Sequence, residues 1–207
     1  MCERCARPAA TCLCRFVTPI DSAVELLILQ HPLEVKNAKG SARLLHLCVG
    51  RSQLAIGETF DQRALADLLN DGGRTPVLLY PDAADHSSLG LPTPVPLDPA
   101  GIEAHKLRLV ILDGTWRKSR KMLFLNPVLQ TLPRYALRAM PPSHYRIRKA
   151  HAPDQLSTLE ASCYALAQIE GGQTKFQPLL IAFDAFVSSL EVYQKLGSSR
   201  TRCVDEA

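Results

Sequence analysis

The chain has 207 residues, of which 46% are hydrophobic and 21% are charged, and its formal net charge is +4. This length is typical of one compact domain with a small appendage, and the composition excludes wholesale disorder. The longest apolar runs are too short to span a membrane, and no apolar signal-peptide core follows Met1. We therefore expect a cytoplasmic protein with reduced thiols, and nothing in the sequence calls for an obligate protein partner.

The basic residues are unevenly distributed along the chain. No Asp or Glu occurs from position 114 to position 153. The basic residues of that stretch are Arg117, Lys118, Arg120, Lys121, Arg134, Arg138, Arg146, Arg148 and Lys149. This segregation predicts an anion-binding surface with nucleic acid as the leading partner. The alternative is a solvated face that acids elsewhere in the fold balance.

Four of the seven cysteines lie within the first fourteen residues. They are Cys2, Cys5, Cys12 and Cys14. Clustered thiols in a reducing compartment more often bind metal than form disulfides, and four thiolates are enough for a closed tetrahedral zinc site. We expect residues 1–18 to form a small module that holds structural zinc. Redox-active thiols or a disordered tail are the alternatives.

From position 24 to position 112 the chain alternates between strand-like and helix-like stretches. We predict strands at 24–30, 52–56, 76–80 and 107–112, and helices at 42–49 and 63–70. The continuous apolar runs at 76–80 and 107–112 are typical of strands that are covered on both faces. Four prolines between them mark a loop.

Two further helices are predicted in the C-terminal part. Residues 157–160 fit a capping box with Ser157 as N-cap, followed by a helix that runs to about Ile169 and ends at Gly171-Gly172. Apolar residues at helical spacing then predict a last helix to Gly197, which leaves 198–207 as a tail. This alternation predicts an α/β domain over 19–197 with a mainly parallel sheet.

Chemistry is expected where the predicted strands end, because ligands of open parallel sheets bind beyond the carboxyl ends of the strands. Three such junctions are Gln30-His31-Pro32, Tyr80-Pro81-Asp82 and Asp113-Gly114-Thr115-Trp116. The last combines an acid, a flexible glycine, a hydroxyl and the only tryptophan of the chain. The alternative is an ordinary turn in which Thr115 caps a helix and Trp116 lies in the core.

The helix expected after this junction opens with four cations, Arg117, Lys118, Arg120 and Lys121. Cations near a helix N-terminus oppose the macrodipole, so this arrangement suggests a site that needs positive charge. Trp116 could stack a base there while the cations hold phosphates. The aromatic and basic run 143–149 suits RNA contact, with an edge strand as the alternative.

Two histidines, His31 and His144, have no pattern of metal ligands around them. Either could be a general base, although a structural histidine is the commoner outcome. The sequence contains no Walker-type loop, no Gly-x-Gly-x-x-Gly and no Gly-x-Ser-x-Gly elbow. ATPases, classical dinucleotide enzymes and α/β-hydrolases are therefore disfavoured.

The motifs and their order resemble the DTW-domain family. Residues 113–116 match the Asp-x-Thr-Trp signature that names the family. The cysteine set, Gln30-His31-Pro32 with Glu34, Lys39-Gly40, 145–149 and 157–160 also resemble it, so the similarity covers nearly the whole chain. One departure is the run 37–43, where the family pattern leads us to expect an Asn-Thr-Gly-Arg-like sequence. A variant loop there could alter donor contacts or the choice of uridine.

The resemblance implies a bacterial-type tRNA-uridine aminocarboxypropyltransferase. Such an enzyme moves the 3-amino-3-carboxypropyl group of S-adenosylmethionine onto N3 of a variable-loop uridine and releases methylthioadenosine. The resemblance also implies a SPOUT-like, knotted fold, which no periodicity could reveal. Asp113 would be the general base, or it would orient the substrate or stabilise the sulfonium. Thr115 would cap the helix or bind ligand, and Trp116 would pack against the base or the donor.

The expected binding residues form three groups. Contacts to S-adenosylmethionine are expected at Tyr80, Pro81, Leu112, Ser157 and Thr158. Contacts to tRNA are expected at Arg117, Lys118, Arg120, Lys121, Arg146, Arg148 and Lys149. The zinc module would stabilise the N-terminus or enlarge the tRNA surface, because four thiolates leave no open position for catalysis. An S-adenosylmethionine-dependent RNA methyltransferase and a non-catalytic zinc-containing RNA-binding protein are the rival interpretations.

Overall fold

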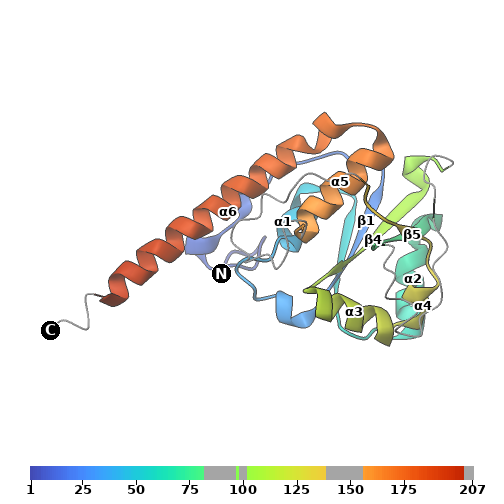
Figure 1. Cartoon of the computed structure of the whole chain (residues 1–207), viewed down its shortest axis with the longest axis horizontal. Coiled ribbons are helices and arrows are strands. Elements are labelled where there is room, and N and C mark those ends of the chain that lie inside the picture. Colours follow the sequence, from blue (N-terminus) through green and yellow to red (C-terminus); the bar gives the residue numbers. More distant parts are fainter. Residues whose placement is uncertain (82–96, 98–101, 139–155, 203–207) are drawn as a thin grey trace.

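The computed structural model describes residues 1–81, 97, 102–138 and 156–202 (Figure 1). Within them, five parallel strands form one sheet in the order β2-β1-β4-β3-β5. The strands are β1 (Glu25–Gln30), β2 (Ser52–Ile56), β3 (Thr75–Leu79), β4 (Leu107–Asp113) and β5 (Arg134–Tyr135). The predicted α/β domain with a parallel sheet is confirmed. β5 was not predicted, because two residues that include an arginine give no apolar run.

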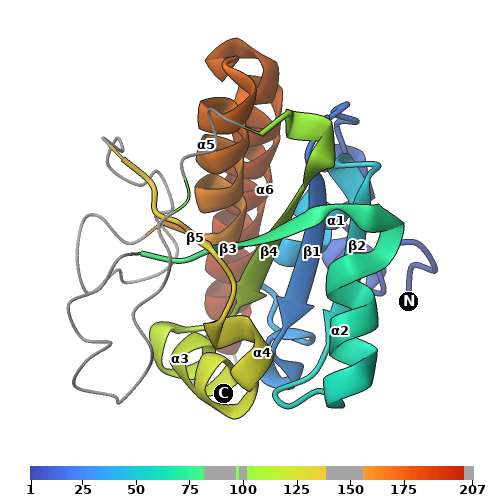
Figure 2. The ribbon, with the colours of Figure 1, turned by 90° about the vertical axis from the view of Figure 1, so that its right-hand side faces the viewer.

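Helices cover both faces of the sheet (Figure 2). One face carries α1 (Ala42–Cys48), α5 (Thr158–Glu170) and α6 (Gln173–Arg202), and the other carries α2 (Gln62–Asn70), α3 (Trp116–Leu125) and α4 (Pro127–Gln130). Short 3-10 helices are η1 (Ala9–Thr11), η2 (Cys14–Phe16), η3 (Pro32–Glu34), η4 (Asp71–Gly73) and η7 (Ala104–Lys106). Side chains alternate along a strand, so Leu26 and Ile28 of β1 enter the first core and Leu27 and Leu29 the second.

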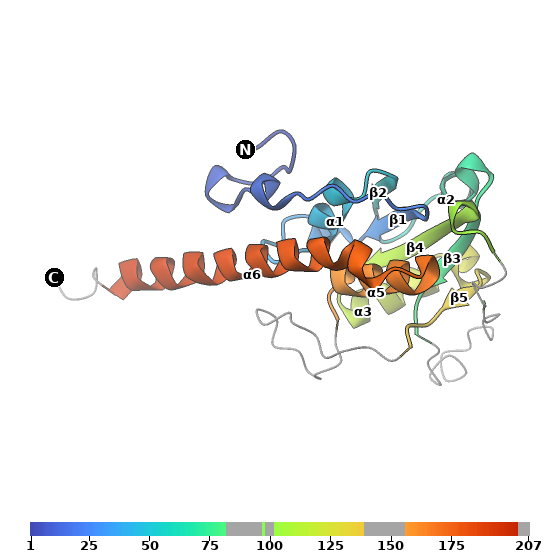
Figure 3. The same ribbon diagram turned by 90° about the horizontal axis from the view of Figure 1, so that it is seen from above.

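The last helix is longer than predicted. α6 continues past Gly197 to Arg202, because a single glycine weakens a helix without ending it. The predicted tail is therefore helical at least over 198–202. The C-terminal part of α6 extends beyond the sheet, and the N-terminal segment lies beside its earlier part (Figure 3). No helix in the described ranges is long and apolar enough to cross a membrane.

Candidate active site

Asp113 lies at the centre of the sheet's carboxyl edge, where it is the last residue of β4 and only 5% exposed. In the pairing of β1 with β4 it lies opposite Gln30, the last residue of β1. Gln30 Nε2 donates to Asp113 Oδ2 over 2.8 Å. Thr158 Oγ1, from the first residue of α5, donates to Asp113 Oδ1 over 2.7 Å. The carboxylate thus joins two central strands to α5.

The turn after Asp113 brings α3 directly to this edge. Thr115 is the N-cap of α3, and its hydroxyl accepts the N–H of Lys118 at 3.4 Å. A Cβ at position 114 would lie 3.1 Å from the Cβ of Lys118 and 3.7 Å from that of His31, so glycine permits this close approach. The capping role considered for Thr115 is confirmed, and it accounts for the helix beginning at Trp116.

An aromatic pair lies beside this turn. Trp116 is 46% exposed, and its ring meets the ring of Tyr80 edge-on at 5.4 Å with an interplanar angle of 86°. Tyr80 directly follows β3 and is buried, and burial raises the pKa of its phenol. The alternative that places Trp116 in the core is wrong, because nearly half of its surface reaches solvent. Its exposed ring is free to contact a ligand.

Arg134 is a residue that sequence reasoning did not single out for the site. It lies on β5 with 1% exposure, and its guanidinium is 5.0 Å from the centroid of the Tyr80 ring. The sequence showed it only as one member of a basic stretch. A buried arginine beside a buried tyrosine places cationic charge next to the aromatic pair.

The other residues expected to contact S-adenosylmethionine, among them Ser157, Leu112 and Pro81, have different surroundings. Ser157 is the N-cap of α5: its Oγ accepts the N–H of Glu160, while its own N–H donates to Glu160 Oε2 at 2.8 Å. The predicted capping box is confirmed. Leu112 is a core residue, whereas Pro81 is exposed after Tyr80.

The cations of α3 fall into two groups. Lys118 Nζ donates to Glu34 Oε1 and Lys121 Nζ pairs with Glu58 Oε2, at 2.7 and 2.8 Å. Lys121 and then His31 hold the pKa of Glu58 below its usual range. Arg117 and Arg120 are exposed and form no ion pair within the described residues. Arg146, Arg148 and Lys149 lie outside the described residues. The two lysines therefore connect α3 to the loops after β1 and β2, while the two arginines face solvent.

The contacts of His31 agree with the structural role that its sequence context made the commoner outcome. Its Nδ1 accepts the N–H of Leu33 at 3.2 Å, so the ring proton is on Nε2, which lies 2.8 Å from Glu58 Oε1. Its backbone N–H donates to the carbonyl of Asp113 at 3.0 Å. His31 therefore fixes the loop after β1 against the end of β4. His144 lies outside the described residues.

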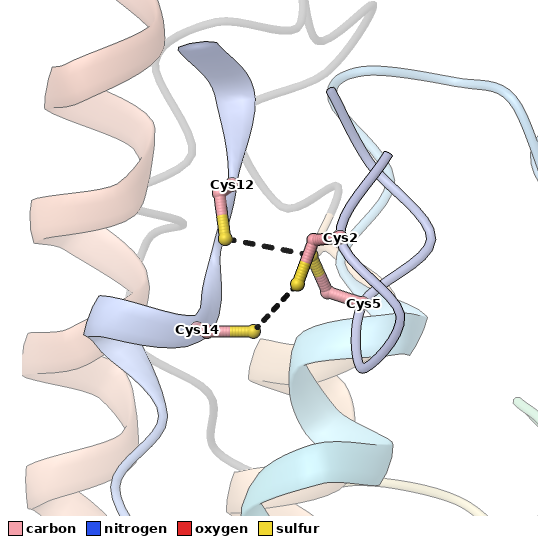
Figure 4. A group of neighbouring side chains, drawn as sticks. All are labelled: Cys2, Cys5, Cys12 and Cys14. Atoms are coloured by element: carbon pink, nitrogen blue, oxygen red, sulfur yellow. Dashed lines mark hydrogen bonds between the residues drawn. The ribbon is translucent and has the colours of Figure 1, made fainter. Parts of the chain in front are cut away.

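The four N-terminal cysteines converge on one point (Figure 4). Their sulfurs all lie within 4.8 Å of one another. The Sγ atoms of Cys2 and Cys14 are 3.6 Å apart, and those of Cys5 and Cys12 are 3.7 Å apart. Tetrahedral zinc with Zn–S bonds of about 2.3 Å places its sulfurs about 3.8 Å apart, so this donor set could hold such an ion. The backbone N–H of Cys5 helps to lower the pKa of Cys2 to about 6, whereas burial raises that of Cys14 to about 12.

An acid and an exposed tryptophan at the carboxyl edge of a parallel sheet make this edge the candidate ligand site of an α/β protein. The family model for the DTW domain matches residues 1–191, and the chain belongs to this family. No solved structure matches the chain.

Three relatives share the name tRNA-uridine aminocarboxypropyltransferase 2. The protein of Drosophila melanogaster is 33% identical over 189 residues, which cover 86% of this chain and 71% of the relative. Those of Mus musculus and Macaca fascicularis are 29% and 28% identical over 196 residues, which cover 90% of this chain. The match covers 62% of each of these two relatives, so the chain spans less than two thirds of their length.

Proposed function

We propose that this protein is a tRNA-uridine aminocarboxypropyltransferase that takes its group from S-adenosylmethionine. The observation that carries the proposal is the similarity, over 86% of this chain, to a relative whose name states this activity. The site supports it, because a buried carboxylate, an exposed tryptophan and exposed arginines lie together at the ligand-binding edge of the sheet. The relatives' name supplies the tRNA and the uridine, and the reaction it states needs an aminocarboxypropyl donor.

The reaction forms one N–C bond and breaks two bonds, the N3–H bond of the uridine and a C–S bond of the sulfonium, and the N3 proton passes to water or to a base such as Asp113. N3 of the uridine loses its proton and attacks the carbon next to the sulfonium, whose bond to sulfur breaks with the electron pair moving to sulfur. Methylthioadenosine then leaves. Since a sulfonium is a good leaving group, holding the two reactants in line supplies much of the catalysis.

Asp113 is the charged group around which we place this chemistry. Both of its oxygens accept hydrogen bonds, which fix the orientation of the carboxylate. These contacts favour the role of a fixed anion that stabilises the sulfonium and orients the substrates. A general base for N3–H is the second role, and it requires one oxygen to face the uridine.

The other assignments follow from exposure and position. Trp116 and Tyr80 offer an aromatic surface for the target base or the donor, and Thr115 can bind ligand only beyond its cap. Pro81, Leu112 and the N-terminus of α5 with Ser157 and Thr158 are the remaining proposed donor contacts. We assign phosphate binding first to Arg117 and Arg120, together with Arg146, Arg148 and Lys149. Lys118 and Lys121 have protein carboxylates as partners and contribute to tRNA binding only through the local field.

Three structural proposals accompany this function. The four cysteines would hold one structural zinc ion, since four sulfur ligands close its coordination shell. Residues 1–18 would be the zinc module, 19–197 the catalytic domain and 198–207 the tail. A SPOUT-like knot follows from the resemblance alone, and the segment 139–155, which connects β5 to α5, lies outside the described residues.

Mass spectrometry of the nucleosides and of the small-molecule product tests the function. Unmodified tRNA is incubated with the protein and S-adenosylmethionine. Aminocarboxypropyl-uridine formed in equal amount with methylthioadenosine is the expected result. A methylated base with S-adenosylhomocysteine would make the protein a methyltransferase, and tight tRNA binding without either product would make it a binding protein.

A further inference from the structure

Arg7 connects the four-cysteine module to a loop next to the active site. It lies between Cys5 and Cys12 in the sequence, yet its guanidinium binds three carbonyls of the loop 37–40. Arg7 Nη1 donates to Ala38 O at 2.6 Å, and Nη2 donates to Gly40 O at 3.0 Å and to Asn37 O at 3.3 Å. The guanidinium also lies 5.2 Å from the ring centroid of Phe186 in α6. Arg7 thus connects the module to the loop and to α6.

The geometry of the module sets the direction of Arg7. The N–H of Cys2 donates to the carbonyl of Arg7 at 2.7 Å, and the N–H of Ala6 donates to the carbonyl of Cys2 at 2.8 Å. Ala6 has φ +55°, a left-handed conformation that is unfavourable for a residue with a Cβ. Two metal ligands, Cys2 and Cys5, belong to the same turn. A metal ion bound by these sulfurs would hold the turn closed and Arg7 in place.

From the loop, one chain of contacts leads to the helix of the Asp-Gly-Thr-Trp motif. Asn37, whose carbonyl Arg7 binds, donates its Nδ2 to Glu34 Oε2 over 2.7 Å. Glu34 is buried, and its other oxygen accepts from Lys118 Nζ at 2.7 Å. Lys118 lies in the first turn of α3, two residues after Trp116.

A second chain of contacts leads to the helix that binds Asp113. The loop runs from Gly40 into Ser41, whose Oγ accepts the N–H of Leu159 at 3.3 Å. Leu159 follows Thr158, which donates to Asp113. A displacement of the loop would therefore reach both Trp116 and Asp113. Shifts of about 1 Å in reacting groups can lower a rate by as much as about a hundredfold.

We infer that Arg7 is a positioning residue through which the four-cysteine module holds the loop 37–40, and with it the active site, in place. This inference rests on the proposed function for the reaction that is positioned. It assigns the module a role in catalytic geometry instead of RNA contact. Arg7 is half-buried and its guanidinium donates to three carbonyl oxygens of its own chain, so we expect it to hold the loop in place instead of binding a phosphate.

The test compares Arg7→Ala with Arg15→Ala, which removes an equal charge from an exposed residue of the same module that no described contact joins to the loop. Hydrogen exchange of the amides of Lys39 and Gly40 reports on the loop without any activity measurement. We expect exchange about tenfold faster or more in Arg7→Ala, because a charged donor to three carbonyls is lost. Arg15→Ala exchanges like the wild type. The kcat for transfer falls several-fold in Arg7→Ala, while its affinity for tRNA and the salt dependence of that affinity stay unchanged.

Two results would overturn the inference. One is an Arg7→Ala protein that retains its metal and shows wild-type loop exchange and kcat. The other is weaker tRNA binding with the salt slope reduced by about 1, which identifies a phosphate contact. If Arg7→Ala loses its metal, Asn37→Ala decides, because it breaks the contact to Glu34 and leaves the module intact. We expect Asn37→Ala to retain its metal and to lose kcat several-fold. A wild-type kcat would contradict the inferred chain of contacts from the loop to the active site. If the wild type transfers no group at all, the proposed function fails. Hydrogen exchange in the loop still tests whether Arg7 holds the loop in place.

Discussion

Thr158 donates its hydroxyl to Asp113 Oδ1 over 2.7 Å, although the two residues are 45 positions apart in the chain. The bond connects the first residue of α5 to the last residue of β4. It brings together two of the stretches that resemble the DTW family, and Gln30 adds a third at the other carboxylate oxygen. Asp113 is therefore where these three stretches meet in space.

Replacing Thr158 with valine tests this meeting point. Valine keeps the shape of the side chain but donates nothing to Asp113, and a hydrogen bond to a charged group contributes about 1.5–3 kcal/mol. We expect Thr158→Val to lower kcat about tenfold or more and to lower the melting temperature. Thr158→Ser retains the hydroxyl and should recover most of both. If the serine and valine variants behave alike, the hydroxyl has no part in the site.

The two groups of cations on α3 should respond differently to substitution. Lys118→Met removes the hydrogen bond from the lysine cation to buried Glu34, and we expect a loss of about 1–3 kcal/mol in the free energy of unfolding. Lys118 is 27% exposed, so solvent keeps the loss below that of a fully buried pair. Arg117→Met should unfold within about 0.5 kcal/mol of the wild type.

The affinity for tRNA should also differ between the Arg117→Met and Lys118→Met variants. Arg117→Met should weaken binding and reduce the slope of log affinity against log salt by about 1, as expected when one phosphate contact is lost. Filter binding at several salt concentrations measures the slope. An unchanged slope in Arg117→Met, or a larger change in Lys118→Met, would reverse the assignment of the two groups.

The sequence predicted the elements better than their contacts. Four strands were predicted, two of them from continuous apolar runs, and α5 was predicted from Ser157 and Glu160, because these signals are local. β5 has only two residues and gave no signal. The contacts of Asp113 were not predictable beyond a shared edge, since they depend on the order and register of strands.

The charges of α3 show the same limit. The sequence showed Lys118 and Lys121 only as cations at the start of a helix and predicted them to contact tRNA, and the carboxylates that bind them come from loops 84 and 63 positions earlier. No local pattern announces such partners. The four cysteines are the opposite case, because they lie close together in the sequence and can approach one another without any long-range contact. The structure confirms that their sulfurs converge.

Glu170 makes the stability of the fold depend on pH in the acidic range. Its side chain accepts hydrogen bonds from Ser22 Oγ at 2.8 Å and from the N–H groups of Ala23 and Val24 at 3.0 and 3.2 Å. Burial opposes its ionisation, but the hydrogen bonds from Lys175, Ser22 and Val24 outweigh burial and lower the pKa of Glu170.

A lowered pKa in the folded state stabilises the protein above the pKa of the unfolded carboxyl, about 4.3, and this contribution is lost as the pH falls through the folded value. Glu170→Gln should therefore melt at a lower temperature than the wild type at pH 7. The difference should shrink as the pH is lowered from 5 to 3. Thermal melts of both proteins across this range measure it, and a difference that stays constant with pH contradicts the assigned role.

The cysteine module should contain one metal ion per chain. Cys12→Ser should lower the metal content, measured by elemental mass spectrometry, and should lower the melting temperature. Cys163→Ala is the control, because Cys163 is a buried cysteine that is not one of the four converging ligands, and the variant should keep the full metal content. Equal metal content in both variants, or none in the wild type, would contradict a metal site.

The most direct test of the whole account is a single-turnover transfer assay on tRNA, comparing the wild type with Asp113→Asn. The amide keeps the size of the side chain but removes the negative charge at the meeting point of the motifs. We expect the wild type to form aminocarboxypropyl-uridine and methylthioadenosine, and the variant to form them at least about a hundredfold more slowly with unchanged affinity for tRNA. An Asp113→Asn protein that transfers the group at the wild-type rate would contradict the account.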